Sequence, residues 1–459
     1  MALGEPQTGT HVSDTTGLVG TGIDRPDAAA PHDPSLHDAG LHDAGLHDTG
    51  PHDPSPRDLD DAGVPADRRP ERLGDVRVLM YSHDTFGLGH LRRCRAVAHA
   101  LVERYKGVSV LIISGSQIAG AFDFRARVDF VKVPSVIKLY SGEYASMRRH
   151  IDLDDTLRLR EQIIRKTARS YRPDILIVDK EPLGLRGEME RTLEEVRARG
   201  CTTVLGLRDV MDAPDVLARE WAARDQLRRM DELYDEVWVY GPEDFWDPLT
   251  GLHVPPSLAS RIRYTGFLRR EAGHVAHLPR AMTSDTVLVT AGGGGDGIGL
   301  MSKVLDAIET DASVPGPFLF VPGPFMRADE RDEIHARAAA LSGAHVVDFE
   351  ADMENMIAAA AALVGMCGYN TFCEVLSFDV PALFVPRTRP RAEQAIRAAR
   401  ADELGYARML AAEDADDPVR MAGALHALRA HPRPSHAEPP PALTGLQTVC
   451  ERVATLTSR

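Results

Sequence analysis

Cysteine and long apolar stretches are scarce in this sequence, and acidic residues outnumber basic ones. The five cysteines are odd in number and scattered, and no two of them have CxxC spacing, so neither a disulfide framework nor a zinc site is indicated. The longest run of small apolar residues, 356–365, is far shorter than the roughly 18 residues that a membrane-spanning helix needs. A reducing cytoplasm is therefore the location that we expect.

The chain carries a formal net charge of −15. This balance argues against nucleic acid, and against an anionic membrane surface, as the main partner. A peripheral membrane contact stays open, because one apolar patch on the first domain would be enough for it. Near the N-terminus no basic segment precedes an apolar core, so no signal peptide is expected.

Residues 1–72 differ in composition from the rest of the chain. They are rich in Gly, Pro, Asp, His and Thr, and a five-residue repeat runs through 36–40, 41–45 and 46–50. Such a segment cannot bury enough apolar surface to offset the entropy that ordering costs, so we predict a disordered, low-complexity tail. Its His-Asp pairs fix no coordination geometry in a flexible chain, and no metal site is predicted there.

From residue 76 onward, short apolar runs alternate with helical patterns. The runs that predict buried strands are 76–81, 108–114, 128–134, 175–179, 202–207, 236–240 and a last short one, 261–265. Short β-rich runs separated by helices, such as an amphipathic one over 91–105, are typical of a parallel, doubly wound sheet. We therefore assign residues 73–267 to an N-terminal Rossmann-like domain, followed by a linker over 268–284.

A second α/β unit follows the linker. Its predicted strands are 286–290, 318–321, 345–349, 363–364 and 382–385. We assign residues 285–430 to a C-terminal Rossmann-like domain and 431–459 to a Pro-rich segment with a terminal helix. The predicted fold class is α/β, with two Rossmann-like domains facing a central cleft.

The loop between the first strand and its helix contains Gly87, Gly89 and His90. Ligands of open α/β sheets bind beyond the carboxyl ends of the strands, so this loop should face the cleft. The two glycines would let the backbone approach a substrate closely. His90 could take a proton from an acceptor hydroxyl, because a histidine pKa can lie near neutrality; alternatively, it only caps the first turn of the helix.

Two aspartates, Asp179 and Asp209, end strands of the first domain. Either carboxylate could orient His90 or hold an acceptor sugar, since a carboxylate bonded to an imidazole stabilises its charged form. Helix capping, or a salt bridge with Lys180 or Arg208, explains the two aspartates equally well.

A run of glycines follows the first strand of the second unit and comprises Gly292, Gly293, Gly294 and Gly295. Such a turn leaves several N–H groups free to hold a diphosphate, and the next helix adds its positive end. The alternative is a tight strand-to-helix turn with no ligand. Asp296 would repel a phosphate, so we expect it to face away.

A later strand ends at Gly368, and a helix opens there with Asn370 and Thr371. The N–H groups and dipole of that helix end favour a polyanion. Glu374 lies one turn further on, where a carboxylate suits the two hydroxyls of a ribose. The stretch therefore favours a nucleotide over bare phosphate. In the loop 387–391, one of three arginines could meet donor phosphates, or all could be solvated.

This part of the chain resembles the C-terminal domain of the GT-B glycosyltransferases in Gly368, Asn370-Thr371, Glu374, the Pro-Ala-Leu-Phe-Val-Pro segment at 381–386 and Gln394. Within that group it is similar to glycosyltransferase family 28, which contains the N-acetylglucosaminyltransferase that completes the peptidoglycan lipid intermediate. The resemblance implies a nucleotide-sugar site with Glu374 on the ribose and Gln394 near the sugar. It also implies backbone groups around Phe349 that read the base, a terminal helix that crosses back to the first domain, and no metal.

The sequence departs from that family in two places. Met366 and Cys367 stand where the family has a polar or basic pair, and Gly294, Gly295 and Asp296 replace its serine and glutamine. The Gly-x-Gly-His pattern at 87–90 resembles both this family and the nucleotide-sugar hydrolases built on the same fold.

We therefore predict a glycosyltransferase that moves a hexose or an N-acetylhexosamine to an acceptor. The donor is a nucleotide-diphosphate sugar whose nucleoside is uridine, and the transfer inverts the configuration of the anomeric carbon. The donor is a co-substrate, and no further cofactor is expected. The acceptor is left open among a glycan, a lipid-linked molecule and a small molecule. Two alternatives remain: a nucleotide-sugar hydrolase or epimerase of the same fold, and a catalytically silent protein that binds nucleotide sugars or glycans.

Overall fold

The computed structural model describes residues 71–83, 88–138, 144–146, 152–273, 278–293, 295–348, 350 and 353–458. The tail predicted over residues 1–72 lies outside this part of the chain, except that Glu71 and Arg72 begin strand β1 (Glu71–Ser82). Among the helices of the described residues, none is long and apolar enough to cross a membrane.

A first sheet of seven parallel strands has the order β3-β2-β1-β6-β7-β8-β9. Its other strands are β2 (Tyr105–Ser114), β3 (Val128–Lys132), β6 (Ile175–Asp179), β7 (Thr202–Arg208), β8 (Glu236–Tyr240) and β9 (Ile262–Tyr264). The helices of this unit are α1 (Gly89–Arg104), α2 (Leu153–Tyr171), α3 (Glu190–Arg197), α4 (Pro214–Ala222), α5 (Gln226–Leu233) and α6 (Pro256–Ala259). The strand order reverses between β1 and β6, so a crevice is expected beyond the carboxyl ends of these two strands.

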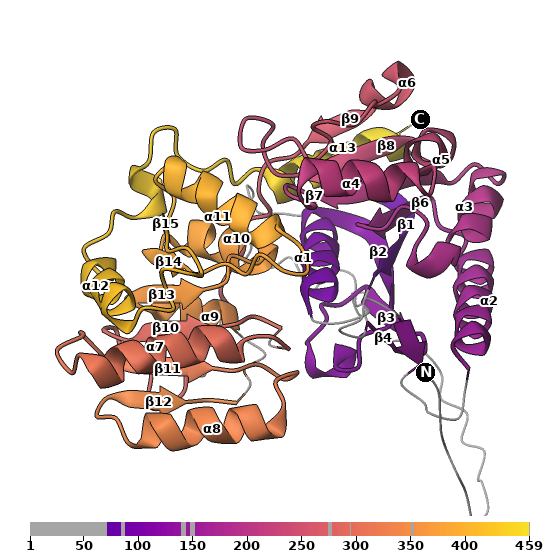
Figure 1. The fold of residues 1–459 in the computed structure, drawn as a ribbon. Coiled ribbons are helices and arrows are strands. Elements are labelled where there is room, and N and C mark those ends of the chain that lie inside the picture. The colour runs from indigo at the N-terminus through magenta and orange to yellow at the C-terminus, as the bar shows by residue number, and fades with distance from the viewer. Residues whose placement is uncertain are drawn as a thin grey trace, which may run out of the picture. The chain divides into compact units, whose positions relative to one another are not determined.

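The second sheet has six strands in the order β12-β11-β10-β13-β14-β15, again parallel (Figure 1). They are β10 (Val287–Thr290), β11 (Phe318–Val321), β12 (Ala344–Val346), β13 (Ala362–Gly365), β14 (Ala382–Phe384) and β15 (Arg408–Met409). Its helices are α7 (Ile298–Thr310), α8 (Ala328–Ala339), α9 (Met353–Ala359), α10 (Tyr369–Phe378), α11 (Glu393–Glu403) and α12 (Pro418–Leu428). Here the order reverses between β10 and β13.

Burial explains why these segments form central strands. Every residue of β6 and β8 is buried, as expected for strands of a parallel sheet with helices on both faces. On α1, the buried Leu91, Cys94, Val97 and Leu101 recur every three to four residues and so give the helix one apolar face. The predicted fold class is confirmed. The short strands β4 (Val136–Lys138), β5 (Tyr144–Ser146) and β15 were not predicted, and β15, with two residues, is too short for a detectable pattern.

The terminal helix α13 (Gly445–Thr457) returns to the first sheet, as Figure 1 shows in yellow beside β8. The hydroxyl of Tyr105 donates to the carbonyl of Cys450 at 3.2 Å, and Arg452 Nε donates to Glu236 Oε2 at 3.2 Å. Helices α1 and α13 are in contact. The predicted crossing of the terminal helix is thereby confirmed.

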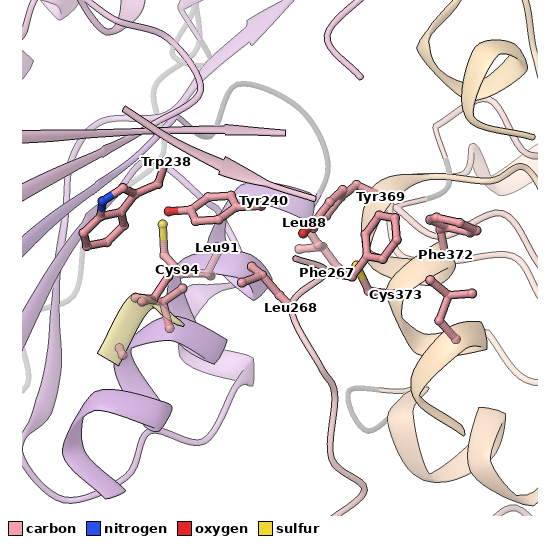
Figure 2. Close-up of a cluster of buried hydrophobic side chains, with 14 of the residues drawn as sticks. Leu88, Leu91, Cys94, Trp238, Tyr240, Phe267, Leu268, Tyr369, Phe372 and Cys373 are labelled. Atoms are coloured by element: carbon pink, nitrogen blue, oxygen red, sulfur yellow. The ribbon is translucent and has the colours of Figure 1, made fainter. Parts of the chain in front are cut away.

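One hydrophobic cluster continues from the first sheet to α10. Figure 2 shows Trp238 and Tyr240 at one end, Phe372 at the other, and Phe267 between them. The rings of Phe267 and Phe372 meet edge to face with centroids 5.3 Å apart. Helix α10 is therefore held next to the start of α1 by packed side chains, and this packing brings together the two segments predicted to carry the site.

Candidate functional site

A cavity of about 220 Å³ lies beyond the carboxyl ends of β1, β10 and β13. Its lining includes the predicted residues Gly89, His90, Gly292, Gly293, Gly295, Gly368, Asn370, Thr371, Glu374 and Gln394. Gly87, Gly294 and Phe349, also predicted for the site, lie outside the described residues. Asp179 and Asp209 are buried and are not part of the lining.

His90 occupies the first turn of α1, the helix that follows β1 in the chain. Its Nδ1 lies 2.5 Å from Oδ2 of Asp179, and its side chain keeps 15% exposure toward the cavity. Burial lowers the pKa of His90 below its usual value, although the hydrogen bond to Asp179 opposes this shift. A neutral imidazole with one nitrogen bonded to a carboxylate can accept a proton on the other nitrogen.

Asp179 is the last residue of β6, and β6 neighbours β1 in the sheet. Arg93, three residues after His90 on α1, donates to both carboxylate oxygens of Asp179. Its Nε donates to Oδ1 at 2.7 Å and its Nη2 donates to Oδ2 at 2.6 Å. Burial raises the pKa of Asp179, but Arg93 and His90 outweigh this effect and hold the pKa below its usual value. The carboxylate beside His90 is therefore anionic.

The structure does not bring Asp209 to His90. Both oxygens of Asp209 accept hydrogen bonds from Arg397 of α11, at 2.8 Å and 2.7 Å, and both side chains are fully buried. The two salt-bridge partners considered in the sequence are also engaged elsewhere, since Arg208 pairs with Glu393 and Lys180 pairs with Glu181. Asp209 is thus an ion-pair residue between β7 and α11.

The glycine turn and the start of α10 face each other. Gly292 has a φ of +67°, a conformation that favours glycine, and a Cβ built on it would lie 3.9 Å from Thr371 Oγ1. Helix α10 begins directly after Gly368. The N–H of Gly292 donates to Thr290 Oγ1 at 3.2 Å. Gly293, Gly295 and the first turn of α10 line the same cavity, where the positive end of the helix favours an anion.

Asp296 does not face away from this cavity, so that expectation is wrong. It lines the cavity, and its Oδ2 lies 2.6 Å from Nη1 of Arg387. The ion pair offsets the negative charge that would repel a phosphate. Arg387 also lines the cavity, and its backbone N–H donates to Oε1 of Gln394 at 3.4 Å.

Glu374 is nearly fully buried, with 1% of its side chain exposed, and contacts Arg92 of α1. Arg92 Nη2 donates to Glu374 at 2.6 Å and to Glu354 at 2.8 Å. Burial raises the pKa of Glu354, but Arg92 outweighs it and lowers this pKa to about 2. Burial raises the pKa of Glu374, and the charge of Glu354 adds to the rise. One guanidinium thus serves two carboxylates.

Asn370 connects three segments of the chain. Its Nδ2 donates to the carbonyl of Gly89 at 3.0 Å, and its Oδ1 accepts from Arg270 Nη2 at 2.8 Å. The side chain of Asn370 therefore fixes the start of α1 against the start of α10. Neither Arg92 nor Arg93 was foreseen from the sequence. For Arg93 a signal existed, because residues three apart on a helix share a face.

No group of three or more potential metal-ligating side chains occurs among the residues that the structure describes. The two aspartates of the Asp-x-Asp sequence at 152–154 lie at the start of a helix: Asp152 is the N-cap of α2 and Asp154 is in its first turn. The helix dipole favours acidic residues there, which explains them without a metal.

Comparisons with known proteins agree with the fold. Residues 326–447 match the model of the glycosyltransferase family 28 C-terminal domain. An uncharacterized glycosyltransferase of Methanosarcina acetivorans is 23% identical over 340 residues, which cover 71% of this chain and 83% of that protein.

Two solved structures share the fold over most of both chains. One is UGT2 of Phytolacca americana, in complex with UDP-2-fluoro-glucose and pterostilbene, with a TM-score of 0.53 and 16% identity over 83% of this chain and 94% of that one. The other, from Listeria monocytogenes, is described as a UDP-N-acetylglucosamine 2-epimerase; its TM-score is 0.53, with 12% identity over 83% and 96% of the two chains.

Proposed function

We propose that this chain, a GT-B glycosyltransferase with a family 28 C-terminal domain, transfers a hexose or an N-acetylhexosamine from a uridine-diphosphate sugar to an acceptor hydroxyl with inversion. The observation that carries the proposal is the make-up of the cavity. A histidine bonded to a buried carboxylate shares it with a glycine turn and a helix N-terminus.

The second sheet would hold the donor. The glycine turn that begins at Gly292 and the first turn of α10 supply N–H groups and a positive helix end for the diphosphate. Glu374 would accept hydrogen bonds from the ribose hydroxyls, and Gln394 would lie near the sugar. That UGT2, a protein of the same fold, was solved with UDP-2-fluoro-glucose supports the choice of uridine.

The first sheet would supply the base. His90 takes the proton of the acceptor hydroxyl as that oxygen attacks the anomeric carbon, and Asp179 stabilises the imidazolium that forms. His90 lies on α1, while the residues that would hold the diphosphate lie on the segments after β10 and β13. A base and a leaving group on opposite sides of the sugar favour in-line displacement, so the product should have the inverted anomeric configuration. The helix end and glycine N–H groups would stabilise the charge on the departing diphosphate.

The test is UDP release from UDP-glucose, UDP-galactose and UDP-N-acetylglucosamine, with and without cell extract as the source of acceptor. The wild type is compared with His90→Ala and with His335→Ala, a control histidine that lies exposed on α8. We expect release that needs the extract, that is lost in His90→Ala and that persists in His335→Ala.

Other outcomes assign the alternatives. Release of UDP without any acceptor would identify a hydrolase, and interconversion of the sugars with UDP still attached would identify an epimerase. Tight UDP binding without turnover of any donor would identify a silent binding protein. Unchanged turnover in His90→Ala would remove His90 as the base.

A further inference from the structure

Asp179 is shared by two residues of α1. Its two oxygens accept from Arg93 Nε at 2.7 Å and from Arg93 Nη2 at 2.6 Å, and Oδ2 also lies 2.5 Å from His90 Nδ1. Arg93 Nη2 is itself 3.1 Å from that nitrogen. Arg93 and Asp179 are each 2% exposed. The three side chains therefore form one closed group, which is more than a histidine-carboxylate pair.

These distances allow one tautomer of neutral His90. A lone pair on Nδ1 would point at an anionic oxygen only 2.5 Å away. A hydrogen on Nδ1 instead donates to Asp179, while Arg93 keeps both of its bonds to the carboxylate. The remaining lone pair of the imidazole is then on Nε2. Nε2 is the nitrogen left to meet a substrate in the cavity.

We propose that Arg93 is a positioning residue that sets the acid-base state of His90. The inference rests on the proposed function, in which His90 is the base. The bidentate guanidinium fixes the side chain of Asp179 and its negative charge, so that His90 keeps its proton on Nδ1 and presents Nε2 to the acceptor. The fixed positive charge of Arg93 also opposes a second proton on the resting imidazole.

The guanidinium is held in place from two further directions. Arg93 Nη1 donates to the carbonyl of Gly89 at 3.4 Å, and the Arg93 guanidinium carbon lies 5.4 Å from the centre of the Tyr369 ring. A buried guanidinium with contacts on its edge and its face has little freedom to move. The position of the Asp179 carboxylate is therefore determined by α1, the same helix that carries His90.

Other charged and titratable groups surround His90. Those on the described elements around it are Asp179 and Lys180 at the end of β6, Arg93 on α1, His83 after β1, and Arg208 and Tyr369 in the cavity lining. Burial lowers the pKa of His90; Asp179 opposes this change, while Arg93 and Lys180 add to it. Burial first, and then the positive charges of Arg93 and Lys180, thus favour the neutral imidazole.

With this assignment, every bond, electron pair and proton of the transfer step has a defined origin and destination. The acceptor oxygen forms a bond to the anomeric carbon, and the bond from that carbon to the diphosphate oxygen breaks with its electron pair leaving on UDP. The hydroxyl proton goes to Nε2 of His90. The resulting imidazolium lies against Asp179 and beside Arg93. Arg93 therefore favours release of that proton and return of the base to its neutral form.

The test is a side-chain ¹⁵N NMR titration of His90, which needs no substrate. The proteins are the wild type, Arg93→Met, Arg93→Lys and the control Arg95→Met, which removes the same charge from the same helix at a residue that packs over Phe122. In the wild type we expect the neutral tautomer with its proton on Nδ1. In Arg93→Met we expect the pKa of His90 to rise by on the order of one unit, because a nearby like charge has been removed.

The remaining variants separate charge from geometry. Arg93→Lys keeps the charge and loses the bidentate bond, so the pKa of His90 should stay within roughly half a unit of wild type while kcat for UDP release falls. Arg95→Met should move the pKa less than Arg93→Met does. A wild-type tautomer with the proton on Nε2, or equal shifts in Arg93→Met and Arg95→Met, would overturn the proposal.

Two further results keep the test decisive. If thermal unfolding shows that Arg93→Met does not fold, the wild-type tautomer and the Arg93→Lys titration still decide. If His90→Ala keeps full turnover, the base assignment of the proposed function is wrong, whatever the titration shows. An unchanged titration in Arg93→Met, together with an inactive His90→Ala, would reject the role of Arg93 and leave the proposed function standing.

Discussion

The two walls of the cavity present different kinds of groups. The wall built on the first sheet presents His90 and Arg93, and both side chains are bonded to the buried carboxylate of Asp179 behind them. The wall built on the second sheet carries a glycine turn, a helix N-terminus and carboxylates that are paired with arginines, Asp296 with Arg387 and Glu374 with Arg92 of α1. Proton transfer needs one atom with a suitable pKa, whereas a diphosphate needs several N–H groups and room.

This difference has a consequence for mutations. If the first wall does chemistry and the second wall binds, then changes in the first should lower kcat with little effect on UDP binding. Changes in the second should weaken UDP binding with less effect on kcat. The substitutions below test this division, each with a control residue outside the proposed role.

The largest effect is expected for Asp179→Asn. Asp179 ends β6 and Asp209 directly follows β7; both are buried, and each accepts two bonds from one arginine. Only Asp179 contacts His90. We expect Asp179→Asn to lower kcat by roughly 10²-fold or more, because an amide leaves the imidazolium unsupported. Steady-state UDP release and calorimetric binding of UDP separate the two quantities.

Asp209→Asn is the control for stability. Each substitution weakens a buried ion pair, which costs on the order of 3 kcal/mol when one partner is lost. Thermal unfolding should therefore show similar losses for both variants. A drop in kcat per folded molecule as large for Asp209→Asn as for Asp179→Asn would contradict the assignment of Asp179 beside the base.

A smaller effect is expected for Glu374→Ala on the other wall. Hydrogen bonds to a charged group contribute about 1.5 to 3 kcal/mol, so the Kd for UDP should rise about tenfold or more. Uridine should lose affinity by a similar factor, since its ribose is the same. Glu354→Ala removes the other carboxylate bonded to Arg92. If the two variants lose UDP affinity equally, the loss comes from the disturbed Arg92 and not from a contact between Glu374 and the ribose.

The fold followed from local patterns in the sequence. β6 and β8 match their predicted ranges because each is a short apolar run that is buried on both faces. The parallel order of each sheet then placed the residues after β1 at the carboxyl edge of the first sheet and those after β10 and β13 at the carboxyl edge of the second. Both edges border the cavity, which is why its lining contains so many predicted residues. The two-residue strand β15 left no such pattern.

The partners in the ion pairs could not be predicted from local sequence patterns. Asp179 and Asp209 look alike in the sequence, and what distinguishes them are arginines 86 and 188 residues away. Asp296 was expected to face away because its charge was considered alone, but Arg387 lies 91 residues further on and neutralises it. Partners so distant in sequence are set by how helices pack, and the residue pattern at either end does not record that packing.

The smallest effect is expected for Gly292→Ala, and it tests whether the second wall binds through its backbone. At a φ of +67° an added Cβ costs about 1 kcal/mol of stability, and it would point toward Thr371 across the proposed diphosphate site. Gly423→Ala is the control, because Gly423 lies exposed within α12 with no atom near its Cβ position; it should gain about 0.5 to 1 kcal/mol. We expect Gly292→Ala to weaken UDP several-fold and uridine hardly at all, measured by calorimetry. Equal weakening of both ligands would mean that the turn contacts the nucleoside, and the diphosphate would then have to be held by α10 alone.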